Sequence, residues 1–280
     1  MVDTSLNIFE KTLSVRKLEA APIEWASARN SLGYALVAIE QSDSDIAALK
    51  QSIDAIKNEL QGCNPEDSLE KWITLQTRYS AALHALGQRD ADDTVSLLNE
   101  AMEAYKSILP FIKRQESPLQ WALLLDNIAR VFQDLGEYSK GTRTLERSIS
   151  AYNNALTQRT SDDAPLEWAM SHNNAAVAMQ ILSEIKQDVD ILKESVVSYG
   201  NANQKLTQEE HPLAWVITTC NLGSARIILA EQVKDIEIAK QAVDNFTDVV
   251  DYFHDVTNSQ YFEYAKQYLD AAQAVLQEIG

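Results

Sequence analysis

Five tryptophans recur at a nearly constant spacing, and this period constrains the fold more than any other feature of the sequence. The successive spacings are 47, 49, 47 and 47 residues, and one further step of 47 reaches Phe262. A period of this length is typical of chains built from stacked supersecondary units rather than one globular core. The five residues are Trp25, Trp72, Trp121, Trp168 and Trp215.

The residues around each tryptophan repeat as well and predict the first helix of each unit. A proline stands three positions before four of the tryptophans, and proline suits the first turn of a helix. At Ser117, we expect the serine to cap the helix and Gln120 to close a capping box. Eight positions after each tryptophan the residue is always small: Gly33, Ser80, Ala129, Ala176 and Gly223.

A second block of apolar residues follows in every copy and predicts a second helix. Its members are separated by four and then three positions, which is the spacing of one helix face. The last member is aromatic in four of the five copies: Ile56, Tyr105, Tyr152, Tyr199 and Phe246. Each repeat is therefore predicted to be a helix–turn–helix unit.

The repeats divide the whole chain, and the sequence predicts an all-α solenoid of about twelve helices in a single array. Terminal half-units either cap such an array or are cuts through a longer one, and we favour the second reading. The expected parts are a half-repeat at 1–20, full repeats at 21–67, 68–116, 117–163, 164–210 and 211–257, and a terminal helix at 258–280.

The repeats resemble the tetratricopeptide family. The Leu32-Gly33 pair and the second-helix pattern Ser148-x-x-x-Tyr152-x-x-Ala155 look like its signature. The segments that begin at Pro165 and Pro212 are closer still to a long bacterial variant with a Pro-x-x-Trp-Ala and Asn-Asn-Leu-Gly motif. The resemblance implies a right-handed superhelix in which the first helices line the concave face. It also implies binding of peptides or protein surfaces, and occasional fusion to catalytic or signalling modules.

The tryptophan row is interpreted as packing between repeats, and the tyrosine row in the second helices is interpreted in the same way. The asparagines five or six positions after tryptophan need another account, because asparagine is a poor residue inside a helix. One reading is a hydrogen-bond ladder between neighbouring first helices. The other is a row of amides that binds the backbone of an extended peptide.

The second reading supplies the candidate partner-binding residues on the concave face. The tetratricopeptide clamp for C-terminal carboxylates needs a specific set of lysine, asparagine and arginine, which these positions lack, so we do not transfer it. The candidates are Asn30, Arg78, Asp126, Asn127, Arg130, His172, Asn173, Asn174 and Asn221.

No motif for catalysis, a cofactor or a metal is recognisable. The four histidines lack metal-ligand spacing, and neither a nucleophile elbow nor a phosphate-binding or dinucleotide-binding loop is present. The acidic pairs at 92–93 and 162–163 are expected in solvated connections, and His211 is expected at a helix start. We therefore expect no enzyme and no cofactor.

The charge of the chain narrows the class of partner. With 24 Lys+Arg against 41 Asp+Glu the net charge is −17, which argues against nucleic acid and against an anionic membrane surface. No apolar run approaches the length of a membrane span, the first residues do not form a signal peptide, and Cys63 and Cys220 lack a pairing motif. We expect a cytoplasmic protein that binds a protein or peptide partner, and the charge favours a basic one.

Two functions remain open on this evidence. The first is a non-catalytic scaffold or adaptor that binds a peptide or protein partner in the concave groove, as a monomer or an end-to-end oligomer. The second is a regulatory or sensory segment of a larger enzyme, such as a protease or kinase fusion, whose catalytic domain is absent from this chain.

Overall fold

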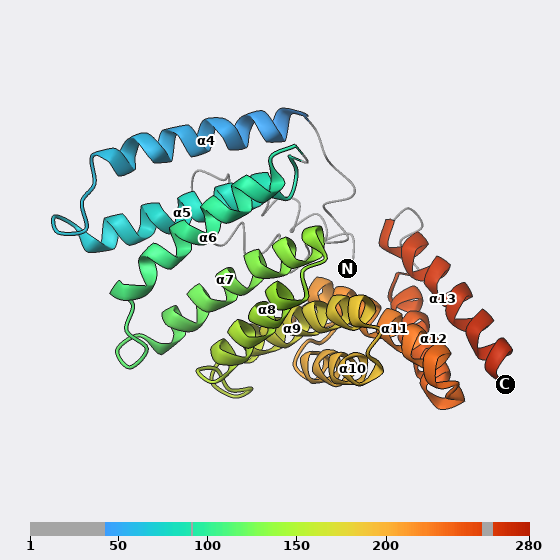
Figure 1. The fold of residues 1–280 in the computed structure, drawn as a ribbon. Helices are drawn as coiled ribbons and strands as arrows, with labels where there is room; N and C mark the ends of the chain where they lie inside the picture. The colour runs from blue at the N-terminus through green and yellow to red at the C-terminus, as the bar shows by residue number, and fades with distance from the viewer. Residues whose placement is uncertain (1–42, 91, 254–259) are drawn as a thin grey trace. The chain divides into compact units, whose positions relative to one another are not determined.

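The computed structural model describes residues 43–90, 92–253 and 260–280 (Figure 1). Within these ranges the chain is all-helical and has no strand. The helices are α4 (Asp43–Gln61), α5 (Leu69–Gly87), α6 (Thr94–Ile108), η1 (Leu109–Phe111), α7 (Pro118–Ser139), α8 (Thr142–Leu156), α9 (Pro165–Lys186), α10 (Val189–Asn203), α11 (Pro212–Val233), α12 (Ile236–Tyr252) and α13 (Gln260–Ile279). The half-repeat at 1–20, the first helix of the repeat at 21–67, Trp25 and Asn30 lie outside the described residues.

The described helices belong to two compact units, one ending at Arg159 and the other beginning at Thr160. In the first, here the N-terminal unit, consecutive helices from α4 to α8 pack on one another. In the second, here the C-terminal unit, consecutive helices from α9 to α13 do the same, and α11 also contacts α9 and α13. Helices that pack in sequence order are what the repeat pattern predicts within each unit.

The first helices begin where the proline pattern places them. Pro118, Pro165 and Pro212 are each the first residue of a helix, where the missing N–H costs no hydrogen bond. His211 occupies the capping position of α11, as expected. Ser117 occupies the same position in α7, but its side chain makes no capping hydrogen bond. The prediction that the Ser117 side chain caps the helix is therefore wrong. The proline is the residue that marks the start of α7.

Short turns follow the ends of the same helices. Helix α7 continues through Gly136 and ends at Ser139. The three helices α7, α9 and α11 end at non-glycine residues in the left-handed region, which lets a two-residue turn reach the next helix. These residues are Lys140, Gln187 and Lys234, with φ of 50°, 54° and 52°.

Small residues allow the two helices of each pair to approach closely. Ser148 Oγ donates to the Ala129 carbonyl at 2.7 Å, and the equivalent Ser195 Oγ donates to the Ala176 carbonyl at 2.9 Å. In the last pair a Cβ at Gly223 would lie 2.6 Å from Cε2 of Phe246. The recurring small position is therefore a contact surface for the aromatic ring of the second helix.

This contact predicts opposite effects for one substitution at two helical glycines. Gly223→Ala is expected to lower the free energy of unfolding by about 1–3 kcal/mol, because the added methyl overlaps a packed ring. Gly200→Ala in α10 meets no atom within 4 Å and is expected to raise it by about 0.5–1 kcal/mol. Urea unfolding of both variants measures the difference. Equal effects of the same sign would contradict the proposed packing.

The four tryptophans that the structure describes each lie at the fourth residue of a helix. Trp168 and Trp215 both lie against the buried cluster that contains Ala202 and Leu206, so Trp215 contacts the preceding second helix α10. The Trp215 ring also lies edge-on to Tyr252, with 5.5 Å between centroids. These contacts match the packing interpretation of the tryptophan row in the C-terminal unit.

Within the described residues one helix, α11, is long and apolar enough to cross a membrane by length and composition. Half of its apolar window is buried inside the structure, and the core helix of a soluble protein passes the same test. This is weak evidence for a span, but the expectation that no segment approaches that length was too strong for α11.

Candidate functional site

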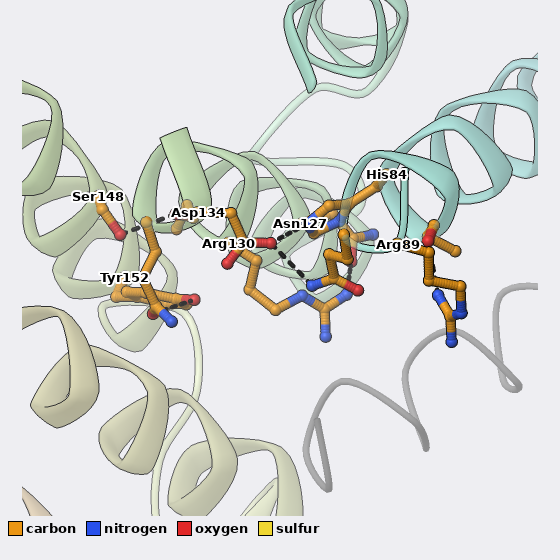
Figure 2. A network of polar contacts seen from close by, with 11 residues as sticks. His84, Arg89, Asn127, Arg130, Asp134, Ser148 and Tyr152 are labelled. Carbon is orange, nitrogen blue, oxygen red and sulfur yellow. Dashed lines mark hydrogen bonds and ion pairs between the residues drawn. The ribbon is translucent and has the colours of Figure 1, made fainter. Parts of the chain in front are cut away.

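In the N-terminal unit a polar network joins neighbouring first helices. His84 on α5 and Asp134 on α7 point toward one another, with 2.6 Å between Nε2 and Oδ2 (Figure 2). Gln88 donates its side-chain N–H to the same carboxylate oxygen at 2.7 Å. The His84 side chain is 1% exposed. Because side chains fifty residues apart meet here, the contact fixes α5 against α7.

A buried ion pair lies in the same unit. Asp126 on α7 accepts a hydrogen bond from Nη1 of Arg159, which follows α8. The two side chains are only 13% and 3% exposed. Asp126 was one of the residues that the sequence proposed for partner binding. In the structure it also anchors the connection after α8.

Asn127 and Arg130, two further sequence candidates, are brought together one turn apart on α7. Nη2 of Arg130 donates to the amide oxygen of Asn127, and both residues are buried. Nε of Arg130 is buried and finds no hydrogen-bond acceptor among the described residues. Burial raises the pKa of Tyr105 to about 12, and the positive charge of Arg130 opposes that shift. Burial likewise raises the pKa of Tyr152 well above its ordinary value, against the same charge.

The C-terminal unit has a neutral counterpart made of amides. Asn221 on α11 donates Nδ2–H to Oδ1 of Asn173 on α9 at 3.2 Å. Asn173 in turn donates to Oδ1 of Asn174 at 3.2 Å. The first of these bonds joins neighbouring first helices, as the ladder reading of the asparagine row predicts. The chain of donors leaves Nδ2 of Asn174 and Oδ1 of Asn221 without a partner among the described residues.

Of the remaining candidates, His172 contacts the second helix of its own pair through Ser198 of α10. His172 is half-buried, its Nδ1 lies 3.0 Å from Oγ of Ser198, and its ring packs on Trp168 with 4.3 Å between centroids. Burial lowers the pKa of His172. Arg78 is half-buried on α5.

Sequence reasoning missed the polar residues twelve positions after tryptophan. Tyr152 donates its hydroxyl to Gln133, and Tyr199 donates to Gln180 at 3.2 Å, so these positions serve the tyrosines of the second helices. His84 is the equivalent residue beside α6. In the fifth repeat the aromatic residue is Phe246, which has no hydroxyl, and the equivalent position is the apolar Ile227. The hydroxyl group and the polar residue that accepts its hydrogen bond are both lost in this repeat. This paired change could have revealed the tyrosine–glutamine pairs from the sequence.

The described side chains offer little to covalent or metal chemistry. Within the described ranges no three His, Cys, Asp or Glu residues lie together as a metal-binding group. Both cysteines are free, and burial raises the pKa of Cys220 to about 12, so its thiol is protonated and unreactive at neutral pH. What the two units offer instead is hydrogen-bonding groups on consecutive first helices.

Comparison with known proteins identifies no family, because no family model and no curated protein match the sequence. One similar solved structure is described as "Crystal structure of BtubC (BKLC) from P. vanneervenii"; it is 13% identical, covers 85% of this chain and 91% of that chain, and has a TM-score of 0.42. A second, "DHF58 filament", is 13% identical over 85% of this chain and 96% of that chain, with a TM-score of 0.19. Such low TM-scores carry no argument about fold or function.

Proposed function

We propose that this chain is a non-catalytic interaction scaffold of tetratricopeptide-like repeats, in which the first helices form a concave groove that binds an extended peptide or protein segment. The observation that carries the proposal is the hydrogen-bonded chain from Asn221 through Asn173 to Asn174. Its ends are an amide donor and an amide acceptor on neighbouring first helices, and neither has a partner in the part of the chain that the structure describes. A peptide backbone offers the complementary C=O and N–H groups.

The burial of the three asparagines, and their order along the hydrogen-bonded chain, support a binding role rather than a purely structural one. The unpaired amide atoms of Asn174 and Asn221 are not among the buried atoms that lack a hydrogen-bond partner, so a ligand can reach them. Asn173 is buried and fully engaged, whereas Asn174 and Asn221 are half-buried at the two ends of the chain. Asn173 therefore orients the other two amides, and these are the groups that contact the peptide.

The net charge of −17 favours a partner that is basic overall, and association with it is expected to slow as salt rises. The proposal includes a cytoplasmic location and a monomeric or end-to-end arrangement. A repeat array is compatible with either state.

A peptide selection followed by amide substitution tests the proposal. Full-length protein selects binders from a random peptide library, and their affinities are compared for wild type and for Asn173→Ala with Asn174→Ala. Each lost hydrogen bond contributes about 1 kcal/mol, so we expect about thirtyfold weaker binding for two bonds. Asn154→Ala, an exposed asparagine on α8, is the matched control and should leave affinity unchanged.

Two outcomes would overturn the proposal. If the library yields no peptide that full-length protein binds in solution, the scaffold function fails. If the double substitution leaves affinity intact and lowers the melting temperature, the amide chain is a structural ladder and does not contact the peptide.

A further inference from the structure

A hydrogen bond between α9 and α10 is replaced by an apolar contact position in the next helix pair. The Tyr199 hydroxyl of α10 donates to the side-chain oxygen Oε1 of Gln180 on α9 at 3.2 Å. In the pair α11 and α12, Phe246 stands in place of the tyrosine and Ile227 in place of the glutamine. Tyr199 and Phe246 are equally buried, at 1% and 0% exposure. Packing of a helix pair therefore does not require the two polar groups, and the Tyr199–Gln180 pair needs another explanation.

The tyrosine fixes the direction of the glutamine amide. Because the hydroxyl proton is donated to Oε1 of Gln180, this oxygen faces Tyr199 and the amide nitrogen Nε2 points away from the hydroxyl. Nε2 carries two protons. Its acceptor among the described residues is Oε1 of the exposed Glu184, at 3.5 Å, which is long for a hydrogen bond. At least one N–H of Gln180 therefore remains for a ligand.

Gln180 shares a face of α9 with the amide chain. It follows Asn173 by seven residues, so the two side chains lie on one side of the helix, about 10 Å apart along its axis. Asn173 accepts the hydrogen bond from Asn221, so this face is the one directed toward α11. Gln180 is half-buried on it. An extended chain covers about 10 Å in three residues, so one bound segment can reach the amide chain and Gln180 together.

We propose that Gln180 donates Nε2–H to a backbone carbonyl oxygen of the bound segment, and that Tyr199 is the positioning residue that orients it. This inference rests on the scaffold function and extends its binding surface along α9. The ligand is the main chain of an extended segment, because a neutral amide donor matches a neutral carbonyl acceptor. No proton is transferred and no charge is buried in this contact.

Two variants separate donation by Gln180 from its contact with Tyr199. Gln180→Glu keeps an oxygen for the hydroxyl but removes both N–H donors, and we expect it to weaken library-selected peptides about fivefold, the equivalent of one hydrogen bond. Gln241→Glu, the same change at an exposed position of α12, is the charge-matched control and should not weaken binding. Gln180→Ile with Tyr199→Phe copies the fifth repeat and should lower affinity equally, with a melting temperature close to that of the wild type.

NMR of the wild-type protein observes the donor directly. The side-chain ¹⁵N–H₂ signal of Gln180, assigned by its disappearance in Gln180→Glu, is expected to shift in a saturable manner as a selected peptide is added. No shift, together with unchanged affinity of Gln180→Glu, overturns the inference even if the double variant fails to fold. If the same peptides still depend on Asn173 and Asn174, the scaffold function survives that failure.

Alanine replacement along the selected peptide identifies the acceptor. The difference in affinity between wild type and Gln180→Glu should persist for every replaced peptide that still binds, because the backbone carbonyls are unchanged. Loss of this difference when one acidic or amide side chain is replaced would show that Gln180 contacts that side chain, and would overturn the assignment to the backbone.

Discussion

Asp126→Ala is expected to lower the free energy of unfolding by about 3–5 kcal/mol. Its carboxylate is the acceptor for Arg159, whose side chain is only 3% exposed. Removing one member of a buried ion pair leaves the other charge desolvated, and that penalty is the large one. Urea unfolding, followed by circular dichroism and by tryptophan fluorescence, measures the loss.

An exposed ion pair supplies the matched control. Lys113 and Glu116 lie 2.8 Å apart, but both side chains are about two-thirds exposed. Glu116→Ala should therefore cost less than about 1 kcal/mol. Replacing Asp126 and Arg159 together should cost less than the sum of the single changes, because no unpaired charge remains. If Asp126→Ala and Glu116→Ala cost the same, the pair is not a buried anchor.

The helical order of the described chain could be predicted from sequence because it depends on local signals. The 47-residue period places the tryptophans, the prolines at helix starts and the apolar faces, and α5, α7, α9 and α11 each begin three residues before their tryptophan. The helix ends could not be predicted in the same way. The turn after α7 depends on Lys140 adopting φ of 50°, and no composition rule favours lysine in that conformation.

The candidate site was predicted only in part, for a related reason. Asn173, Asn174 and Asn221 repeat with the tryptophans, so their shared height on the helices was visible in the sequence. His84 meets Asp134, and Asp126 meets Arg159, through contacts that occur in one place and do not repeat. The 47-residue period reveals the residues that the repeats share. The residues that distinguish one unit from the other do not follow this period, so it cannot reveal them.

The same reasoning indicates where specificity lies. Positions that repeat, such as the small residues under the aromatic rings, are constrained by packing in every pair. Positions that vary at constant height, such as Arg78, Asn127, Asn174 and Asn221 at six residues after tryptophan, are free to match a partner. Under our proposal, the positions that vary within each unit therefore determine what that unit recognises.

Phe246→Ala is expected to destabilise the C-terminal unit by about 3–5 kcal/mol. The side chain is fully buried on α12 and stacks on Tyr268 of α13, with 5.5 Å between ring centroids. Its ring also fills the space beside Gly223 on α11. One truncation therefore opens a cavity at the meeting point of three helices, where the backbone cannot close it.

Two further variants separate this packing effect from a general loss of apolar surface. Val197→Ala removes an apolar group that is 63% exposed and should change the free energy of unfolding by less than about 0.5 kcal/mol. Gly223→Ala should lose its cost when it is combined with Phe246→Ala, because its methyl then enters the vacated space. If the two changes were instead additive, the ring of Phe246 would not be the group that requires glycine at position 223.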